Sequence, residues 1–150
     1  HQKGIFVIEN KNYTGCIYGS EADREWCQVT GGQHYSFYNP IRQNSFHIRH
    51  LRHFLTDRLD CMGYGADGTI YDSVITFNGG ARLRIRKPSS KDVLVANSAR
   101  IKRKLGWRLF WRRRVYTRKE VDQIWQILKQ QQNPSKKTIR RHARELKKYR

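Results

Sequence analysis

The sequence predicts an α/β fold, and three observations support this prediction. Short apolar segments rich in β-branched residues, beginning at residues 5–8, are typical of strands. A long segment that starts at Pro40 repeats its apolar residues every three or four positions, which is typical of a helix. The 150 residues are 37% hydrophobic and 29% charged, which allows one domain with a moderate core.

The first strand is predicted from the apolar run Ile5 to Ile8, which fits a strand covered on both faces. Because successive side chains of a strand point to opposite faces, Glu9 and Lys11 would extend one face of this strand side by side. The next elements predicted are a turn at residues 12–15 and strands at residues 16–18 and around residues 26–29.

A helix is predicted to begin at Pro40, with Asn39 as its N-cap, because proline at the first helical position lacks only an N–H that would be unpaired anyway. At 100° per residue, Gln43 and His47 form a stripe one turn apart at the edge of the buried face. The residues predicted to form that buried face are Ile41, Ile48, Leu51, Leu55 and Leu59.

The second half predicts strands at residues 69–77, 81–86 and 92–96, the second of them with Arg82, Arg84 and Arg86 on its outer face. Beyond Ser98 the sequence becomes helical and basic, and Thr117 to Glu120 fits a capping box that starts a last helix. We therefore expect a core over residues 1–97, a basic helical extension over residues 98–133 and a basic tail over residues 134–150.

The charge of the protein is +19 and is concentrated in its second half. Residues 1–75 carry 7 Lys or Arg and 8 Asp or Glu, whereas residues 76–150 carry 24 and 4. Such a polycation favours phosphate polymers or anionic lipid as a partner, because neutralising them releases condensed counterions.

Residues 100–116 interleave eight basic side chains with aromatic ones, which favours nucleic-acid binding through phosphate contacts and base stacking. The alternative is that Leu105, Trp107, Leu109 and Phe110 pack on the sheet while the arginines face water. A third interpretation is a basic amphipathic helix lying on a membrane. The residues predicted to bind nucleic acid are Arg103, Lys104, Trp107, Arg108, Trp111, Arg112, Arg113 and Arg114.

The three cysteines form no CxxC pair, so the sequence suggests neither a zinc knuckle nor a full disulfide framework. A reduced, cytoplasmic location is therefore expected. No apolar run approaches the roughly 20 residues of a membrane-spanning helix, so no transmembrane segment is predicted.

Glu9 and Lys11 are costly on a strand that is otherwise apolar, unless they hold something. A carboxylate suits Mg²⁺, and a nearby ammonium can steady a hydroxide or the charge that develops on a phosphate, so the pair fits phosphodiester hydrolysis. An E-x-K triplet alone is a weak signal, since it also marks strands that leave a core.

A resemblance strengthens the catalytic interpretation. The segment "GIFVIENKNYTG", followed by Gly19, Ser20, Trp26 and "FYNPIRQN" with His47, resembles the nuclease-related domain, NERD, a family of the PD-(D/E)XK nuclease superfamily. The resemblance implies a restriction-endonuclease-like mixed sheet flanked by helices. It also implies that Glu9 binds Mg²⁺ or Mn²⁺, with the Asn10 carbonyl as a further ligand, that Lys11 assists the attacking water, and that Gln43 and His47 belong to the site.

The implied function is metal-dependent hydrolysis of nucleic acid, with DNA favoured over RNA. The family also carries an aspartate about a dozen residues before the glutamate, and this sequence has only eight residues before Glu9. Three explanations follow: the chain is truncated, another carboxylate substitutes, or the protein is an inactive nucleic-acid-binding module that retains the nuclease fold. The carboxylates considered as substitutes are Glu21, Asp23, Glu25 and Asp72.

Overall fold

The computed structural model describes residues 1–60 and 70–130. The chain divides into two compact units, residues 1–116 and 117–150, and each is described here by itself. The predicted basic tail at residues 134–150 lies outside the described residues, and the domain limits proposed after residues 97 and 133 stay predictions.

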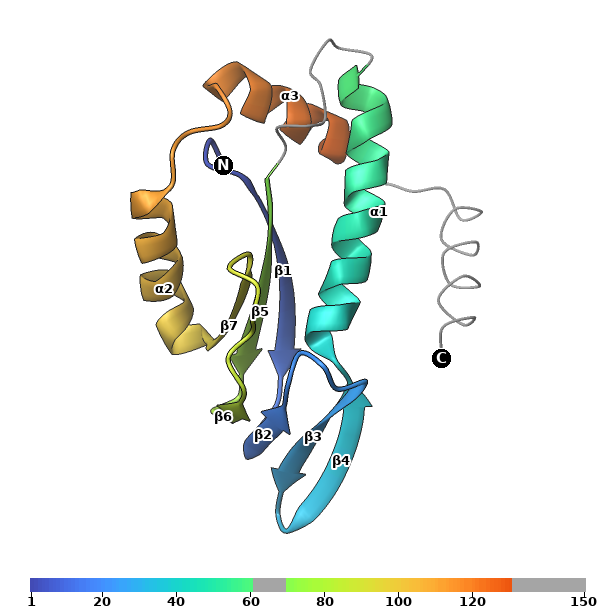
Figure 1. Ribbon diagram of the computed structural model, residues 1–150, viewed down its shortest axis with the longest axis vertical. Coiled ribbons are helices and arrows are strands. Elements are labelled where there is room, and N and C mark those ends of the chain that lie inside the picture. The colour runs from blue at the N-terminus through green and yellow to red at the C-terminus, as the bar shows by residue number, and fades with distance from the viewer. Residues whose placement is uncertain (61–69, 131–150) are drawn as a thin grey trace. The chain divides into compact units, whose positions relative to one another are not determined.

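The first unit contains two sheets (Figure 1). A parallel sheet has the strand order β1-β5-β7, and a mixed sheet has the order β4-β3-β2-β6, in which only β2 and β6 pair in parallel. With helices packed beside them, these sheets confirm the predicted α/β fold of restriction-endonuclease-like type. The strands are β1 Ile5–Asn12, β2 Cys16–Gly19, β3 Glu25–Thr30, β4 Gln33–Tyr38, β5 Tyr71–Asn78, β6 Arg82–Ile85 and β7 Val93–Asn97.

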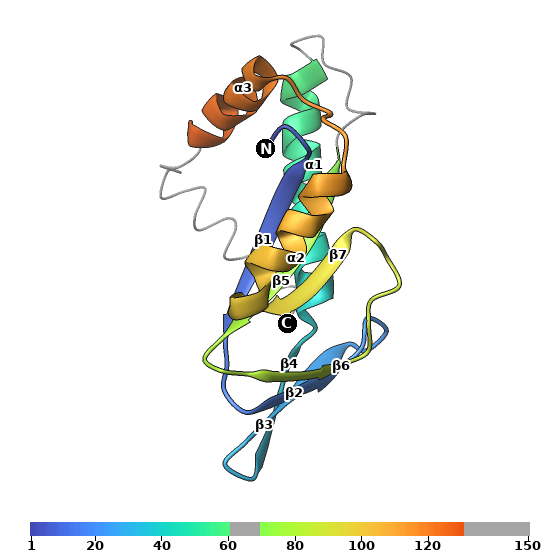
Figure 2. The same ribbon diagram turned by 90° about the vertical axis from the view of Figure 1, so that its left-hand side faces the viewer.

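Two helices cover opposite faces of the parallel sheet (Figures 1 and 2). Helix α1, Pro40–Asp60, packs against β1 and β5, and helix α2, Ser98–Trp111, packs against β5 and β7. Neighbouring residues of β5 hold the two helices, because Ser73 Oγ accepts a hydrogen bond from α1 while the Asp72 carboxylate binds α2. Strand β5 is therefore the element to which both helices attach.

The core of the first unit lies where the two sheets meet. Trp26 from β3 and Phe77 from β5 are 2% and 1% exposed, and their rings stack with centroids 6.2 Å apart. Burial of such large rings removes more apolar area from water than any aliphatic side chain of this core. The other buried members of the cluster are Ile17, Ile41, Ile75, Ala81 and Val95.

Two local expectations fail. Strand β1 is not covered on both faces, since α2 packs against β5 and β7 and leaves Ile8 59% exposed. Strand β4 has no counterpart among the predicted elements, and all its side chains except the half-buried Phe37 are exposed. It forms instead by pairing antiparallel along the whole of β3.

Asn39 fixes the start of α1, as predicted, and does more than cap the helix. Its Oδ1 accepts a hydrogen bond of 2.9 Å from the Ile41 N–H. Its Nδ2 donates to the carbonyls of Ser20, Glu21 and Asp23 at 3.1, 3.3 and 2.7 Å, and the side chain is fully buried. The direction in which α1 leaves the sheet is therefore tied to the loop after β2.

We expect Asn39→Ala to lower the free energy of unfolding by about 3 kcal/mol, because it removes a cap and three hydrogen bonds from a fully buried side chain to the loop after β2. Asn39→Asp should cost at least as much at neutral pH, although aspartate is an equally good N-cap, since a carboxylate has no donor for those carbonyls. Urea unfolding measures both values. An Asn39→Asp variant as stable as the wild type would contradict this role. Arg49→Ala, at an exposed position further along α1, should change stability by less than about 0.5 kcal/mol.

The second unit contains helix α3, Arg118–Lys129. Its predicted capping box is confirmed, because Thr117 Oγ1 accepts a hydrogen bond from the Glu120 N–H and the Glu120 carboxylate accepts one from the Thr117 N–H. The hydrogen bonds from the Thr117 backbone and hydroxyl lower the pKa of Glu120. On this helix Ile124 is buried and Trp125 is 51% exposed.

Candidate active site

The four side chains predicted to form an active site lie together between β1 and α1. Lys11 Nζ lies 2.8 Å from Glu9 Oε1 and donates a hydrogen bond of 2.8 Å to Gln43 Oε1. The other carboxylate oxygen of Glu9 lies 3.5 Å from His47 Nδ1. Two residues of a strand and two residues of a helix, 32 positions apart between Lys11 and Gln43, therefore form one contiguous polar group.

The group formed by these four side chains is largely shielded from water but accessible at one border. The side chains of Glu9 and Lys11 are 14% and 17% exposed, so they are largely shielded from water, while His47 at 39% forms the accessible border. In such surroundings a charge pair interacts more strongly than in bulk water. The ammonium of Lys11 is shared by two oxygens, which fixes its position.

Asn44 is a residue of this region that the sequence reasoning missed. It is fully buried beside Gln43, and its Nδ2 donates hydrogen bonds to the Val7 carbonyl at 2.8 Å and to Ser73 Oγ at 2.9 Å. It therefore joins α1 to β1 and β5 next to Gln43. The available signal was its position three residues after Ile41, a polar residue on the apolar stripe.

Glu9 has the donor chemistry of a magnesium ligand. Mg²⁺ typically binds one or two carboxylates and keeps several waters, so one carboxylate matches the lower end of that range. Among residues 1–60 and 70–130, no group of three or more His, Cys, Asp or Glu side chains is placed to hold a metal ion. Within those residues, Glu9 is therefore not part of a cluster of three such ligands.

Glu21 and Asp23, two of the acidic residues considered as substitutes, have other partners. Glu21 Oε2 accepts hydrogen bonds from the Ser89 hydroxyl and N–H, at 2.7 and 2.9 Å, and these lower the pKa of Glu21. Asp23 Oδ2 accepts a hydrogen bond of 2.7 Å from the Ser20 N–H. Glu25 is exposed at the start of β3, on the mixed sheet.

Asp72 lies on the opposite face of the parallel sheet from Glu9. It is fully buried, and Arg108 Nη1 donates a hydrogen bond of 2.9 Å to its Oδ1 while Arg112 binds both of its oxygens. These partners come from α2 and its C-terminal end, whereas the partners of Glu9 outside its own strand come from α1. Asp72 therefore anchors α2 and does not complete the group around Glu9.

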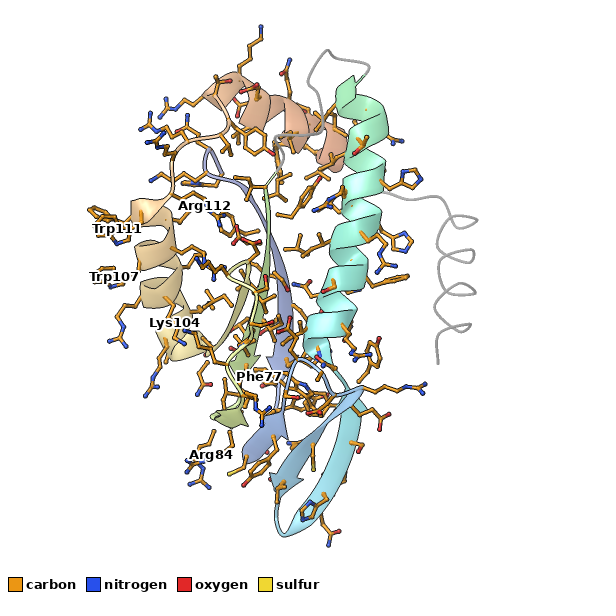
Figure 3. All side chains as sticks on the ribbon, viewed as in Figure 1. Phe77, Arg84, Lys104, Trp107, Trp111 and Arg112 are labelled. Carbon is orange, nitrogen blue, oxygen red and sulfur yellow. The ribbon has the colours of Figure 1, made fainter. Side chains whose placement is uncertain are left out.

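The residues predicted to bind nucleic acid fall into two sets. Arg108 and Arg112 point towards the sheet, and their side chains are 19% exposed. Trp107 and Trp111 are 65% and 73% exposed, and Figure 3 shows them pointing away from the sheet while Arg112 points towards it. The remaining predicted residues, Arg103, Lys104, Arg113 and Arg114, are exposed.

The alternative that Trp107 and Phe110 pack on the sheet is wrong, since Trp107 is 65% and Phe110 is 74% exposed. Leu105 and Leu109 are half-buried, as that alternative expected. The Asp72 ion pairs also attach α2 to the sheet.

Two further expectations from the sequence concern membrane-spanning helices and the cysteines, and the structure tests them over the described residues. None of the helices over residues 1–60 and 70–130 is both long and apolar enough to cross a bilayer. Cys16 and Cys27 are free thiols, and Cys61 lies outside the described residues.

Comparison with known proteins gives a family match over the part of the chain that contains the candidate site. The family model of the nuclease-related domain matches residues 1–78. Over 65 residues, or 43% of the chain, the sequence is 40% identical to an uncharacterized protein of Bacillus anthracis, of which the match spans 31% of the length. No solved structure matches the chain significantly. Residues 1–78 include β1, α1 and β5, and with them all four side chains of the candidate site.

Proposed function

The chain belongs to the nuclease-related domain family, and from this premise we propose that it is a metal-dependent nuclease that hydrolyses phosphodiester bonds of DNA at the Glu9 group. The observation that carries the proposal is the placement of Lys11 Nζ at 2.8 Å from both Glu9 Oε1 and Gln43 Oε1. A cation held in this way beside a carboxylate is suited to a reaction in which negative charge develops on a phosphate.

Each side chain has a proposed role. Glu9 would hold Mg²⁺ or Mn²⁺, with the Asn10 carbonyl as a further ligand, and such an ion supplies a nucleophilic water at neutral pH and neutralises phosphate charge. Lys11 positions the water and stabilises the charge that develops. Gln43 keeps the Lys11 ammonium in place, and His47, at the accessible border, orients Glu9 or the scissile phosphate.

The test is cleavage of supercoiled plasmid and of single-stranded DNA with Mg²⁺ or Mn²⁺. We expect cutting that EDTA abolishes, and we expect Lys11→Met to slow it by about 100-fold or more, because the transition-state charge loses its stabilising cation. Gln43→Ala should slow cleavage less, since the lysine itself remains.

Arg84→Ala is the matched control, because it removes one positive charge from the exposed side of β6, on the mixed sheet. It should leave the cleavage rate within about twofold of the wild-type rate. A loss of cleavage seen only in Lys11→Met then does not result from a general loss of attraction for DNA. Cleavage that is equally fast in the Lys11→Met variant would reject the proposed site. Salt-sensitive DNA binding without any cleavage would instead indicate an inactive binding module.

A further inference from the structure

Helix α2 displays three large aromatic rings on its outer surface. Trp107, Phe110 and Trp111 are 65%, 74% and 73% exposed, and the Phe110 ring meets the Trp111 ring edge-on at 5.2 Å. Exposed apolar clusters of this size on a folded unit usually mark a binding surface. We call the outward side chains Arg103, Lys104, Trp107, Phe110 and Trp111 the α2 platform.

The cations of the α2 platform are available to a ligand. At 100° per residue, Arg103 and Lys104, together with the neighbouring Arg100, fall within the same arc of the helix as the three aromatic rings. All three are exposed, and no ion pair with an acidic residue in the described part of the chain involves them. Their charge is therefore free to attract phosphate.

A depression of about 480 Å³ lies beside the rings. It is lined by Trp107 and Trp111, by Lys91, and by Arg108 and Arg112, whose guanidinium groups are fixed by Asp72. Flat apolar walls next to ammonium and guanidinium groups match the two parts of a nucleotide, an aromatic base and a phosphate.

We propose that the α2 platform binds single-stranded nucleic acid, with bases stacked on Trp107 and Trp111 and the backbone held by the surrounding cations. An unpaired strand is required because the bases of a duplex are stacked on one another and cannot reach indole rings on a helix. A membrane suits the surface less well, because its apolar rings are confined to residues 107–111, little more than one turn of α2, and the outward side chains before them, Arg100, Arg103 and Lys104, are charged.

The α2 platform is distinct from the candidate active site. Its helix covers one face of the parallel sheet, whereas Glu9 and its partners lie on the face covered by α1 (Figure 1). The stretch of nucleic acid bound at the α2 platform is therefore not the stretch that would lie beside Glu9. Binding at the platform needs no metal, so it can be measured in EDTA, where its failure is separate from any failure of cleavage.

The experiment measures fluorescence anisotropy of a labelled oligothymidylate of about 20 nucleotides with the full chain in EDTA at low salt. We expect the Trp107→Ala, Trp111→Ala double variant to bind at least about tenfold more weakly, with an unchanged dependence on salt because no charge is removed. The corresponding double phenylalanine variant should recover most of the affinity, since it restores two stacking rings. Quenching of tryptophan fluorescence by the oligonucleotide should disappear in the alanine double variant.

The matched control is Trp125→Ala, which removes another exposed indole, 51% accessible, from α3. It should bind the oligonucleotide within about twofold of the wild type. Equal affinity of the wild type and the alanine double variant would overturn the proposal, as would tighter binding of duplex than of single strand. If the alanine double variant loses binding to phosphatidylglycerol and phosphatidylcholine vesicles but keeps its affinity for the oligonucleotide, a membrane surface replaces the proposal.

Discussion

Replacing Asp72 with alanine is expected to lower the free energy of unfolding by about 4 kcal/mol, because it leaves two arginines in a largely buried position without a counter-charge. Asp72 is fully buried, and Arg108 and Arg112 both bind its carboxylate from the side of α2. The loss should appear as a lower urea midpoint and as weaker protection of the α2 amides from hydrogen exchange.

Two further variants separate the ion pairs from simple packing. Asp92→Ala removes a carboxylate that lies 3.7 Å from Arg112 but is 63% exposed, and it should cost less than about 1 kcal/mol. Replacing Asp72, Arg108 and Arg112 together with leucine should give a protein more stable than Asp72→Ala, since no buried charge is then left unpaired. If Asp72→Ala unfolds at the wild-type urea concentration, the anchor has been misidentified.

Trp26→Ala is expected to destabilise the first unit by a similar amount, about 4 kcal/mol, because it opens a large cavity where the two sheets meet. Trp26 is 2% exposed, stacks on Phe77 and donates a hydrogen bond of 2.8 Å from Nε1 to the Ser20 carbonyl. The measurement is again equilibrium unfolding, followed by circular dichroism.

The conservative substitution Trp26→Phe should cost only about 1–2 kcal/mol. It keeps an aromatic ring against Phe77, and the Ser20 carbonyl retains its hydrogen bond of 3.1 Å from Asn39 Nδ2. Tyr35→Ala, on the neighbouring strand β4 and 52% exposed, should cost less than about 1 kcal/mol. A phenylalanine variant as unstable as the alanine variant would show that the indole N–H dominates over ring packing.

The sequence alone correctly predicted those features that depend on residues close together in the chain. Asn39 and Pro40 marked the start of α1, and Thr117 with Glu120 marked the start of α3, because caps depend on residues only a few positions apart. The strand period placed Glu9 and Lys11 on one face, and the helical period placed Gln43 and His47 at the edge of the buried face. Their convergence across 32 residues follows from these two periods once α1 packs on β1.

The features that the sequence could not supply depend on pairing between distant residues. The helical period places Arg108 and Arg112 on the side of α2 opposite to Arg103, but the sequence does not name their partner, and only the packing of α2 on β5 brings them to Asp72. The mixed sheet likewise required long-range information, since β4 buries little of its surface and is defined by its antiparallel partner β3. Asn44 had a signal in its position, but the acceptors of its amide, on Val7 and Ser73, lie on two different strands.

The adjacency of Asp72 and Ser73 has a consequence for how the molecule assembles. Consecutive residues of a strand face opposite ways, so a shift of β5 by one residue would turn a carboxylate towards α1 and a hydroxyl towards the arginines of α2. A single shift in register would then remove both the hydrogen bond from α1 to Ser73 and the ion pairs from α2 to Asp72. The candidate active site and the α2 platform are therefore expected to form in one cooperative folding step, and a chain with only one of them correctly folded should be rare.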